Sequence, residues 1–261
     1  MRRLCGAAPR IATCAIAVCG ALTAAPAPAS AVGVPTSTWT YGRSVGHRPV
    51  IVTRRGFASA DVTDVLVVGV IHGNETAGVP ITRRLRSLVP PPGVRLWIID
   101  SSNPDGQRAG SRQNLRGVDL NRNFPFGWRG GGSPFDVFFP GHAAGSEPEG
   151  AVLRRLIGAV RPDVTIWYHQ HMDLVVRPDG AARIAVARAY AYASGMRLRA
   201  YPGPALYGTA TSWQNTAQPA GAAFVVELPA GALPRARVAR HAQAVLRTGA
   251  FVHTRDVGTV P

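Results

Sequence analysis

The first candidate functional residues are His72 and Glu75, which are three residues apart and could bind a metal ion. His169, far from them in the sequence, could be the third ligand. Two imidazoles and one carboxylate form the ligand set of many catalytic zinc sites, in which a fourth position stays open for water. A His-x-x-Glu pair alone also fits the start of a helix, where glutamate is favoured. The metal interpretation therefore depends on the third ligand. His169 directly follows the apolar segment VTIWY, and His171 is the alternative because both histidines would face the same side of a strand.

Each of four apolar, β-branched segments is followed or ended by a polar residue: His72, Asn103, His169 and Glu227. In open α/β sheets, ligands bind at the carboxyl ends of the strands, where separate loops converge. A carboxylate such as that of Glu227 is costly in an apolar strand unless it has a partner. The four residues together predict one site rather than four isolated polar groups.

The elements that would position these residues alternate between strands and helices. We expect strands at 64–71, 94–99, 164–168 and 222–228, and helices at 77–88, 146–160, 181–194 and 233–248. Ser146 is a suitable N-cap with Glu149 three residues on, as in a capping box, and Gly195 and Gly249 would end the last two helices. This alternation predicts an α/β fold, a three-layer α/β/α sandwich around a mixed, mainly parallel sheet.

The segment 101–145 lacks this periodicity and is rich in Gly, Pro, Asn and Arg. A connection of this length within one domain is usually functional. We therefore expect it to contribute side chains to the site.

Several short motifs follow one another in a fixed order along the chain. They are GVIHGNE at 69–75, NPDG at 103–106, RQN at 112–114, GVDLNRNF at 117–124, WYHQ at 167–170 and FVVEL at 224–228. This series resembles the motifs of the M14, or carboxypeptidase A-like, zinc carboxypeptidases, and the Asn-Arg motif at 117–124 is its most specific part. The resemblance extends from about residue 41 to residue 250. It implies a carboxypeptidase-like fold and a peptide hydrolase.

The resemblance also implies a catalytic centre. His72, Glu75 and His169 would bind one Zn²⁺ per chain, which would lower the pKa of a water molecule and polarise the scissile carbonyl. Glu227 would be the general base, which takes the proton of the water and returns it to the leaving amine. Arg112 would stabilise the oxyanion with a fixed positive charge.

Three residues of the motif GVDLNRNF would support this centre, again by resemblance. Asn121 and Arg122 would hold the terminal carboxylate of the substrate, for which a guanidinium fork is well suited. Asp119 would lie behind the metal ligands and orient His72 through its second ring nitrogen.

Two further expectations concern the bound substrate. Tyr207 resembles the mobile tyrosine that caps the substrate in this family, with Tyr201 as the alternative. The pocket for the departing side chain would lie near 209–213, where the sequence has no acidic residue. We therefore expect no strict preference for a C-terminal Lys or Arg.

The charge of the chain is strongly positive. Its 261 residues include 29 basic residues, all of them arginine, and 14 acidic ones, so that the formal charge is +15. The arginines are spread along the chain, without a basic helix or zinc-finger spacing, and we expect no nucleic-acid partner. Contact with an anionic wall polymer is compatible with the charge. With 46% hydrophobic and 16% charged residues, the composition excludes a disordered chain or a coiled coil.

The N-terminal segment has the pattern of a signal peptide. Arginines precede an uncharged stretch, and Ala29-Ser30-Ala31 has the small-x-small form of a cleavage site. We expect a signal peptide at 1–31, a short leader at 32–45 and the zinc carboxypeptidase catalytic domain at 46–261. The mature chain, with 26 arginines and 14 acidic residues, would carry a charge of +12. It would be secreted or associated with the cell wall.

All three cysteines, Cys5, Cys14 and Cys19, fall in the predicted signal peptide. The mature chain would therefore have neither disulfides nor thiolate chemistry. A lipoprotein anchor at Cys19 is the alternative, but Val18 precedes it where a small residue is expected. We expect no transmembrane segment, since no later stretch is apolar for long enough. We expect a monomer, although the sequence does not define the oligomeric state.

These observations lead to the hypothesis of an exported zinc metallocarboxypeptidase that releases the C-terminal residue of peptides. Two alternatives share the fold: a murein peptide amidase that cuts the γ-D-glutamyl–diaminopimelate bond, and an N-acyl amino acid deacylase. A non-catalytic module that binds wall or peptide is a further alternative, opposed by the retention of the metal ligands, the base and the carboxylate clamp. Serine and cysteine hydrolases are excluded, because there is no Gly-x-Ser-x-Gly elbow and no mature cysteine.

Overall fold

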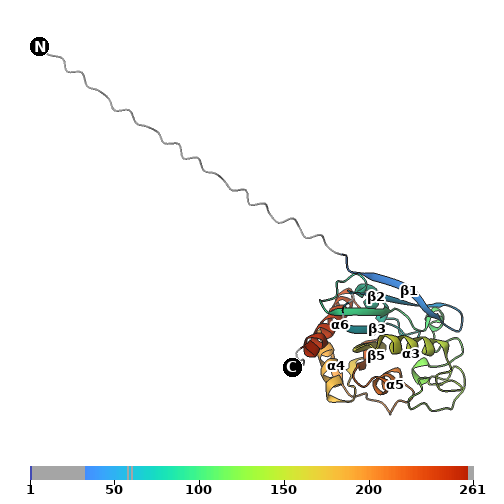
Figure 1. The fold of residues 1–261 in the computed structure, drawn as a ribbon. Helices are drawn as coiled ribbons and strands as arrows, with labels where there is room; N and C mark the ends of the chain where they lie inside the picture. Colours follow the sequence, from blue (N-terminus) through green and yellow to red (C-terminus); the bar gives the residue numbers. More distant parts are fainter. Residues whose placement is uncertain (2–32, 58, 60, 258–261) are drawn as a thin grey trace. The chain divides into compact units, whose positions relative to one another are not determined.

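The computed structural model describes residue 1 and residues 33–257, apart from 58 and 60 (Figure 1). The chain divides into two units, Met1–Gly33 and Val34–Pro261. Apart from Met1, the predicted signal peptide, its cleavage site and the three cysteines lie outside the described residues. Within the described part, no helix is both long enough and apolar enough to span a membrane.

The second unit contains seven strands, six α-helices and one 3-10 helix among the described residues. They are β1 (Thr36–Arg43), β2 (Pro49–Arg55), β3 (Thr63–Val68), α1 (Gly78–Leu85), β4 (Val94–Ile99), α2 (Pro104–Ala109), η1 (Leu120–Arg122), α3 (Pro148–Val160), β5 (Val164–Val176), α4 (Ala181–Ser194), β6 (Arg197–Arg199), α5 (Ala210–Ala217), β7 (Ala222–Pro229) and α6 (Arg235–Val257).

The seven strands form one sheet in the order β1-β2-β4-β3-β5-β6, and β7 also pairs with β5. The pairs β3–β4, β3–β5, β5–β6 and β5–β7 are parallel, while β1–β2 and β2–β4 are antiparallel. The prediction of a mixed, mainly parallel sheet is confirmed.

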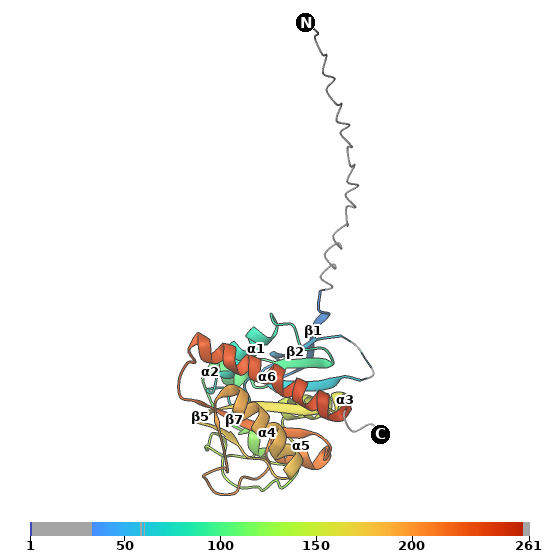
Figure 2. The ribbon, with the colours of Figure 1, turned by 90° about the vertical axis from the view of Figure 1, so that its left-hand side faces the viewer.

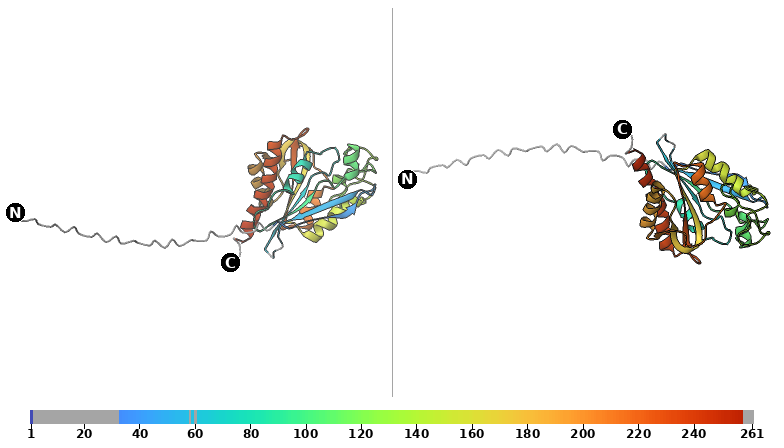
Figure 3. Two further views of the ribbon diagram at one scale, coloured as in Figure 1. Left: turned by 90° about the horizontal axis from the view of Figure 1, so that it is seen from above. Right: turned by 90° about the horizontal axis from the view of Figure 1, so that it is seen from below.

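The strands β3, β4, β5 and β7 bury side chains on both faces of the sheet, as their apolar sequences indicate. Along β3, Val65 and Val67 join a core with α1, α4 and α6, whereas Leu66 and Val68 join a second core with α3 and α5. This follows from the period of two in a strand. Figure 2 looks onto the face covered by α4 and α6, and Figure 3 shows α3 on the opposite face. The three-layer α/β/α sandwich is therefore confirmed.

Of the three helix boundaries that were argued from caps, one is confirmed, because α4 ends at Ser194 with Gly195 as a left-handed C-cap. The other two differ from the prediction. The helix α3 begins at Pro148, with Glu147 as N-cap and no side-chain cap. The expected capping box does not form, because Glu149 instead accepts hydrogen bonds from the Val45 amide and the Asn114 side chain. The helix α6 continues through Gly249, where a Cβ would lie 2.8 Å from a methyl group of Val94. This glycine allows close packing of the helix on the sheet rather than ending it.

The residues expected in a short leader, 32–45, include a strand. Thr36–Arg43 forms β1, which pairs antiparallel with β2 at the edge of the sheet. Neither strand was expected, nor were the short elements β6 and α5. The sequence of β1 is largely polar, and at the edge most of its side chains are exposed, so it lacks the apolar pattern on which strand prediction relies.

A buried polar network connects the sheet to the helices α4 and α6. The hydroxyl groups of Tyr168 and Tyr190 lie 2.9 Å apart, and the Tyr190 hydroxyl lies 2.8 Å from His241 Nδ1. Burial, together with the positive charges of Arg237 and Arg240, lowers the pKa of His241 to about 4. His241 is therefore neutral in the folded protein at pH 5 to 7.

We expect this histidine to make folding stability depend on pH. The folded state takes up its proton near pH 4, but an unfolded histidine does so near pH 6.5, so stability falls as the pH drops through this window. Through this histidine, the free energy of unfolding of the unmodified protein should fall by up to about 3 kcal/mol between pH 7 and 4.5. The variant His241→Asn should lack this part of the fall. Urea unfolding at a series of pH values measures this difference.

The control is His47→Asn, because His47 is exposed and has a positive φ that asparagine tolerates. This variant should keep the pH dependence of the unmodified protein. An equal pH dependence for His241→Asn and the unmodified protein would show that His241 does not titrate in this way.

Candidate active site

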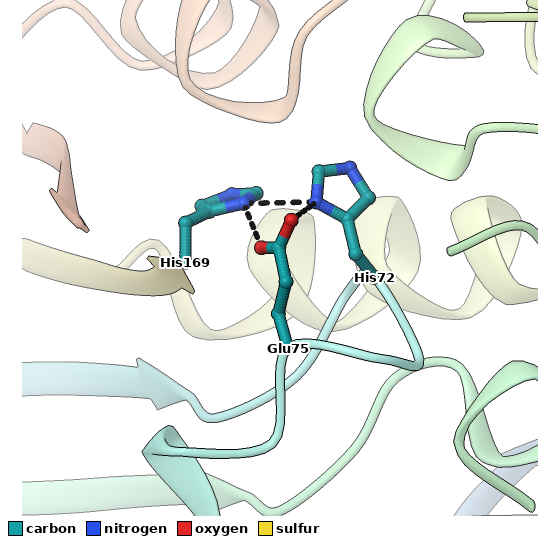
Figure 4. Close-up of side chains that lie close together, drawn as sticks. All are labelled: His72, Glu75 and His169. Carbon is teal, nitrogen blue, oxygen red and sulfur yellow. Dashed lines mark hydrogen bonds and ion pairs between the residues drawn. The ribbon is translucent and has the colours of Figure 1, made fainter. Parts of the chain in front are cut away.

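Three potential metal ligands meet beyond the carboxyl end of β3, beside the middle of β5 (Figure 4). His72 and Glu75 come from the loop that follows β3, and His169 lies within β5. His72 Nδ1 lies 2.9 Å from Glu75 Oε1, and His169 Nδ1 lies 3.0 Å from Glu75 Oε2. The two Nδ1 atoms are 3.1 Å apart. All three side chains are buried, so their donor atoms converge away from bulk water.

This arrangement fits zinc. Two ligands of a tetrahedral zinc with bonds of about 2.0–2.1 Å lie roughly 3.3 Å apart, close to the separations of these three donor atoms. Two imidazoles and one carboxylate leave one position for water or substrate, as in catalytic sites. His171 is exposed and lies outside the cluster of donor atoms.

Asp119 and Arg112 surround the ligands with a network of charged hydrogen bonds. Asp119 is fully buried, and its Oδ1 lies 3.0 Å from His72 Nε2, the ring nitrogen that faces away from the other ligands. Arg112 donates to Asp119 Oδ2 from Nε and Nη2, at 3.0 and 2.9 Å, and to Glu75 Oε1 from Nη1, at 3.0 Å. A carboxylate on the second ring nitrogen fixes the tautomer and orientation of a metal-binding histidine.

The electrostatics keep the two carboxylates of this network ionised. Burial alone would raise the pKa of Glu75, but His72 and His169 outweigh it and hold that pKa well below its usual range. The pKa of Asp119 is also far below its usual range, because His72, Arg112 and Arg122 together outweigh the effect of burial. Both groups therefore stay negatively charged and can bind or orient cations at neutral pH.

Glu227 reaches the same site from the neighbouring strand. It is the register partner of His169 in the parallel pair β5–β7, so the two side chains leave the same face of the sheet. It is 8% exposed, and its Oε2 has no hydrogen-bond partner among the described residues. Burial raises the pKa of Glu227, with a further contribution from Glu75. A buried, unpartnered carboxylate of raised pKa is suited to accept and return a proton.

Arg122 and Asn121 lie beside this centre in η1. The Arg122 guanidinium is largely buried and makes one hydrogen bond in the described part of the chain, from Nη1 to Asn121 O at 2.7 Å. Most of its five N–H groups are therefore available to a ligand. Asn121 Oδ1 accepts a hydrogen bond from the Ala210 amide at 2.9 Å, which fixes η1 against α5.

These residues line one cavity of about 820 Å³. Its wall includes all the candidates for metal binding, catalysis and carboxylate binding except Asp119, which lies behind the ligands. Of the two tyrosines, Tyr201 lines this cavity, whereas Tyr207 lines a smaller neighbouring one with its ring stacked on Arg129. The ring of Phe138 covers both arginines, at 5.5 Å from Arg112 Cζ and 5.0 Å from Arg122 Cζ. The sequence analysis did not select Phe138, since no spacing distinguishes it from its neighbours.

The long segment 101–145 is ordered by asparagine side chains rather than by regular structure. Asn103 Oδ1 accepts from the Gly106 amide at the start of α2, and its Nδ2 donates to Ile71 O beside the metal ligands. Asn123 Nδ2 donates to Pro140 O at 2.7 Å, and its Oδ1 accepts from the Glu147 amide at 3.1 Å. Side-chain bonds of this kind satisfy backbone groups that have no strand or helix partner. The expectation that this segment contributes to the site agrees with the positions of Arg112 and Arg122.

A zinc carboxypeptidase family profile, that of the M14 peptidases, matches residues 92–237, which is more than half of the chain. The chain therefore belongs to the zinc carboxypeptidase family, as the ordered motifs predicted. The match includes His169, Glu227 and the segment 101–145, and it begins after His72 and Glu75.

Curated relatives and solved structures add detail to the family. The chain is 33% identical to murein peptide amidase A of Escherichia coli strain K12 over 156 residues, which cover 55% of this chain and 63% of that protein. The match therefore spans less than two thirds of the length of this relative. The structure of murein-tripeptide amidase from Escherichia coli O157 matches with a TM-score of 0.62 and 25% identity, over 87% of this chain and 94% of that one. Carboxypeptidase A from Helicoverpa armigera matches with a TM-score of 0.73 and 20% identity, over 85% and 69% respectively, and so shows the fold alone.

Proposed function

We propose that this chain is a zinc-dependent amidase of murein peptides, which hydrolyses the bond between γ-D-glutamate and diaminopimelate. The observation that carries the proposal is the 33% identity to murein peptide amidase A. The match to the murein-tripeptide amidase structure, over 94% of that chain, supports the same substrate class. The candidate residues for metal binding, proton transfer and carboxylate binding converge at one cavity, which supports catalysis rather than binding alone.

Each residue of the site has its own role in the proposed reaction. His72, Glu75 and His169 would hold one zinc ion. When bound, zinc supplies a Lewis acid that polarises the scissile carbonyl and lowers the pKa of water. Glu227 accepts a proton from the attacking water and donates it to the leaving nitrogen as the C–N bond breaks. The products are the γ-carboxylate of D-glutamate and the free amine of diaminopimelate.

The two arginines bind two different negatively charged groups of the substrate. Arg112 donates three N–H groups to Asp119 and Glu75, which leaves N–H groups on Nη1 and Nη2 for the carbonyl oxygen as it becomes negative. Arg122 and Asn121 bind the free α-carboxylate of the departing residue, since the Arg122 guanidinium has no carboxylate partner within 4.0 Å in the described residues. We also propose that the protein is exported, because the segment 1–31 has the pattern of a signal peptide.

A product analysis tests this function against a general carboxypeptidase. The zinc-loaded protein is incubated with L-Ala-γ-D-Glu-diaminopimelate and, separately, with N-blocked peptides that differ in their C-terminal residue. Mass spectrometry should detect release of diaminopimelate from the first substrate. Release of single residues from the second pool alone would instead establish a carboxypeptidase of ordinary peptides.

A further inference from the structure

The cavity extends well beyond the metal ligands, along the inner face of β7. Glu227, Val225 and Ala223 line it, and at about 3.3 Å per residue they cover about 13 Å of strand. One wall of this extension is polar: Thr211, Ser212, Asn215 and Thr216 lie on one side of α5, at spacings of one, four and five residues. The extension is therefore a deep pocket with a polar wall, which suits a long side chain with polar ends.

Charged side chains of opposite sign line the same cavity, and two of them, Arg177 and Asp179, are exposed. Asp179 and Arg177 come from the segment between β5 and α4, and Arg183 comes from the first turn of α4. Neither Asp179 nor Arg183 has an ion-pair partner within 4.0 Å among the described residues, and they do not pair with each other. Asp179 was not expected at this pocket, because the expectation concerned only residues 209–213, which include no acidic residue.

Arg183 is fixed in place by the backbone around the start of β7. Its Nε donates to Gly221 O at 3.0 Å, and its Nη2 donates to Asn215 O at 2.9 Å and to Pro219 O at 2.8 Å. Its Nη1 makes no hydrogen bond in the described part of the chain and lies 3.6 Å from where a Cβ on Gly180 would be. The carbonyl groups hold the guanidinium rigidly without neutralising it, so a positive charge with free N–H groups lies beside Gly180, which follows Asp179 in the sequence.

We propose that Asp179 and Arg183 determine specificity by binding the distal ammonium and the distal carboxylate of the departing residue. This inference rests on the proposed function, in which that residue is diaminopimelate, whose side chain ends in both groups. A side chain with only an ammonium leaves Arg183 unpaired, and one with only a carboxylate leaves Asp179 unpaired. An apolar side chain leaves both charged groups without a partner and gains neither interaction. A side chain that ends in both groups satisfies the two residues at once.

Four substrates of the same length test each charge separately. They have the form L-Ala-γ-D-Glu-X, in which X is diaminopimelate, lysine without the distal carboxylate, 2-aminopimelate without the distal ammonium, or norleucine without both. The unmodified zinc-loaded protein should cleave the diaminopimelate substrate with a kcat/KM about tenfold or more above that of either singly charged substrate, as expected for a lost charge-assisted hydrogen bond. Norleucine should be poorest. Equal kcat/KM values across the series would overturn the inference.

Two variants assign the charges to residues. Asp179→Asn should lower kcat/KM about tenfold for the diaminopimelate and lysine substrates alone, and Arg183→Gln should do the same for the diaminopimelate and 2-aminopimelate substrates. Asp179 makes no hydrogen bond within the described residues, so its substitution leaves the fold in place even if loss of Arg183 does not. The control is Asp61→Asn, which removes an exposed carboxylate outside the cavity and should change none of the four values. A uniform loss for Asp179→Asn with all substrates would contradict its role.

Calorimetry with the free amino acids separates this inference from the proposed function. Diaminopimelate should bind the protein with a Kd about tenfold or more below that of norleucine, and Asp179→Asn should remove most of this difference. If no substrate is cleaved but this preference is found, the proposed function fails and the binding site stands. If substrates are cleaved but diaminopimelate binds no better than norleucine, the binding site fails and the amidase stands.

Discussion

Glu227→Gln should lower kcat by about 10²- to 10⁴-fold, the usual contribution of a general base, while zinc stays bound. Glutamine has nearly the same shape as glutamate but cannot accept the proton of the attacking water. The Oε2 atom of Glu227 has no hydrogen-bond partner among the described residues, so the substitution breaks no hydrogen bond at that atom. Steady-state kinetics with the murein peptide, together with the zinc content of the purified protein, measure both effects.

The matched control for Glu227 is Glu149→Gln. Glu149 is also a buried glutamate whose pKa is raised by burial, but it bonds to Val45 and Asn114 and does not line the cavity. Its substitution should change the free energy of unfolding and leave kcat within about twofold of the unmodified protein. A Glu227→Gln protein with near-normal kcat would remove Glu227 as the base.

His169→Ala should abolish stoichiometric zinc binding. Loss of a residue that only hydrogen-bonds to a metal ligand raises the Kd for zinc roughly 10- to 100-fold. Because His169→Ala removes one of the three ligands themselves, we expect a larger rise. His171→Ala is the control, because His171 is exposed and lies outside the donor cluster. Competition with a chelating dye measures both affinities. Loss of zinc from His171→Ala, with retention by His169→Ala, would exchange their roles.

The fold and much of the candidate site could be predicted from the sequence because both depend on local patterns. Buried parallel strands are continuous apolar runs, so β3, β4, β7 and the first part of β5 were found by their composition, and polar residues at or near the ends of these runs marked the site. The strand expected at 164–168 continues through His169 to Val176. The motif at 117–124 indicated Arg122 and Asp119 through its resemblance to the motif of the zinc carboxypeptidases.

What the sequence could not show depends on contacts between distant residues. The edge strand β1 has a polar sequence and is defined by its pairing with β2. Gly249 has the residue type of a helix end, but its packing against Val94 determines its role. Asp179 lines the cavity only because the connection between β5 and α4 brings it there. No spacing in the sequence encodes that approach.

The sequence also did not decide which tyrosine caps the substrate. The two candidates are six residues apart, and the motif favours Tyr207, whereas the structure has Tyr201 at the cavity and Tyr207 in the neighbouring one. The assignment of Tyr207 stays a prediction, because it concerns a complex with substrate.

The central claim is that one zinc ion, held by His72, Glu75 and His169, makes this chain a hydrolase of murein peptides. Metal-free protein is titrated with zinc, and the rate of diaminopimelate release is measured at each addition. We predict no release without zinc, a linear rise and a plateau at one equivalent per chain. Full activity of the metal-free protein, or a rate that does not depend on added zinc, would contradict the claim.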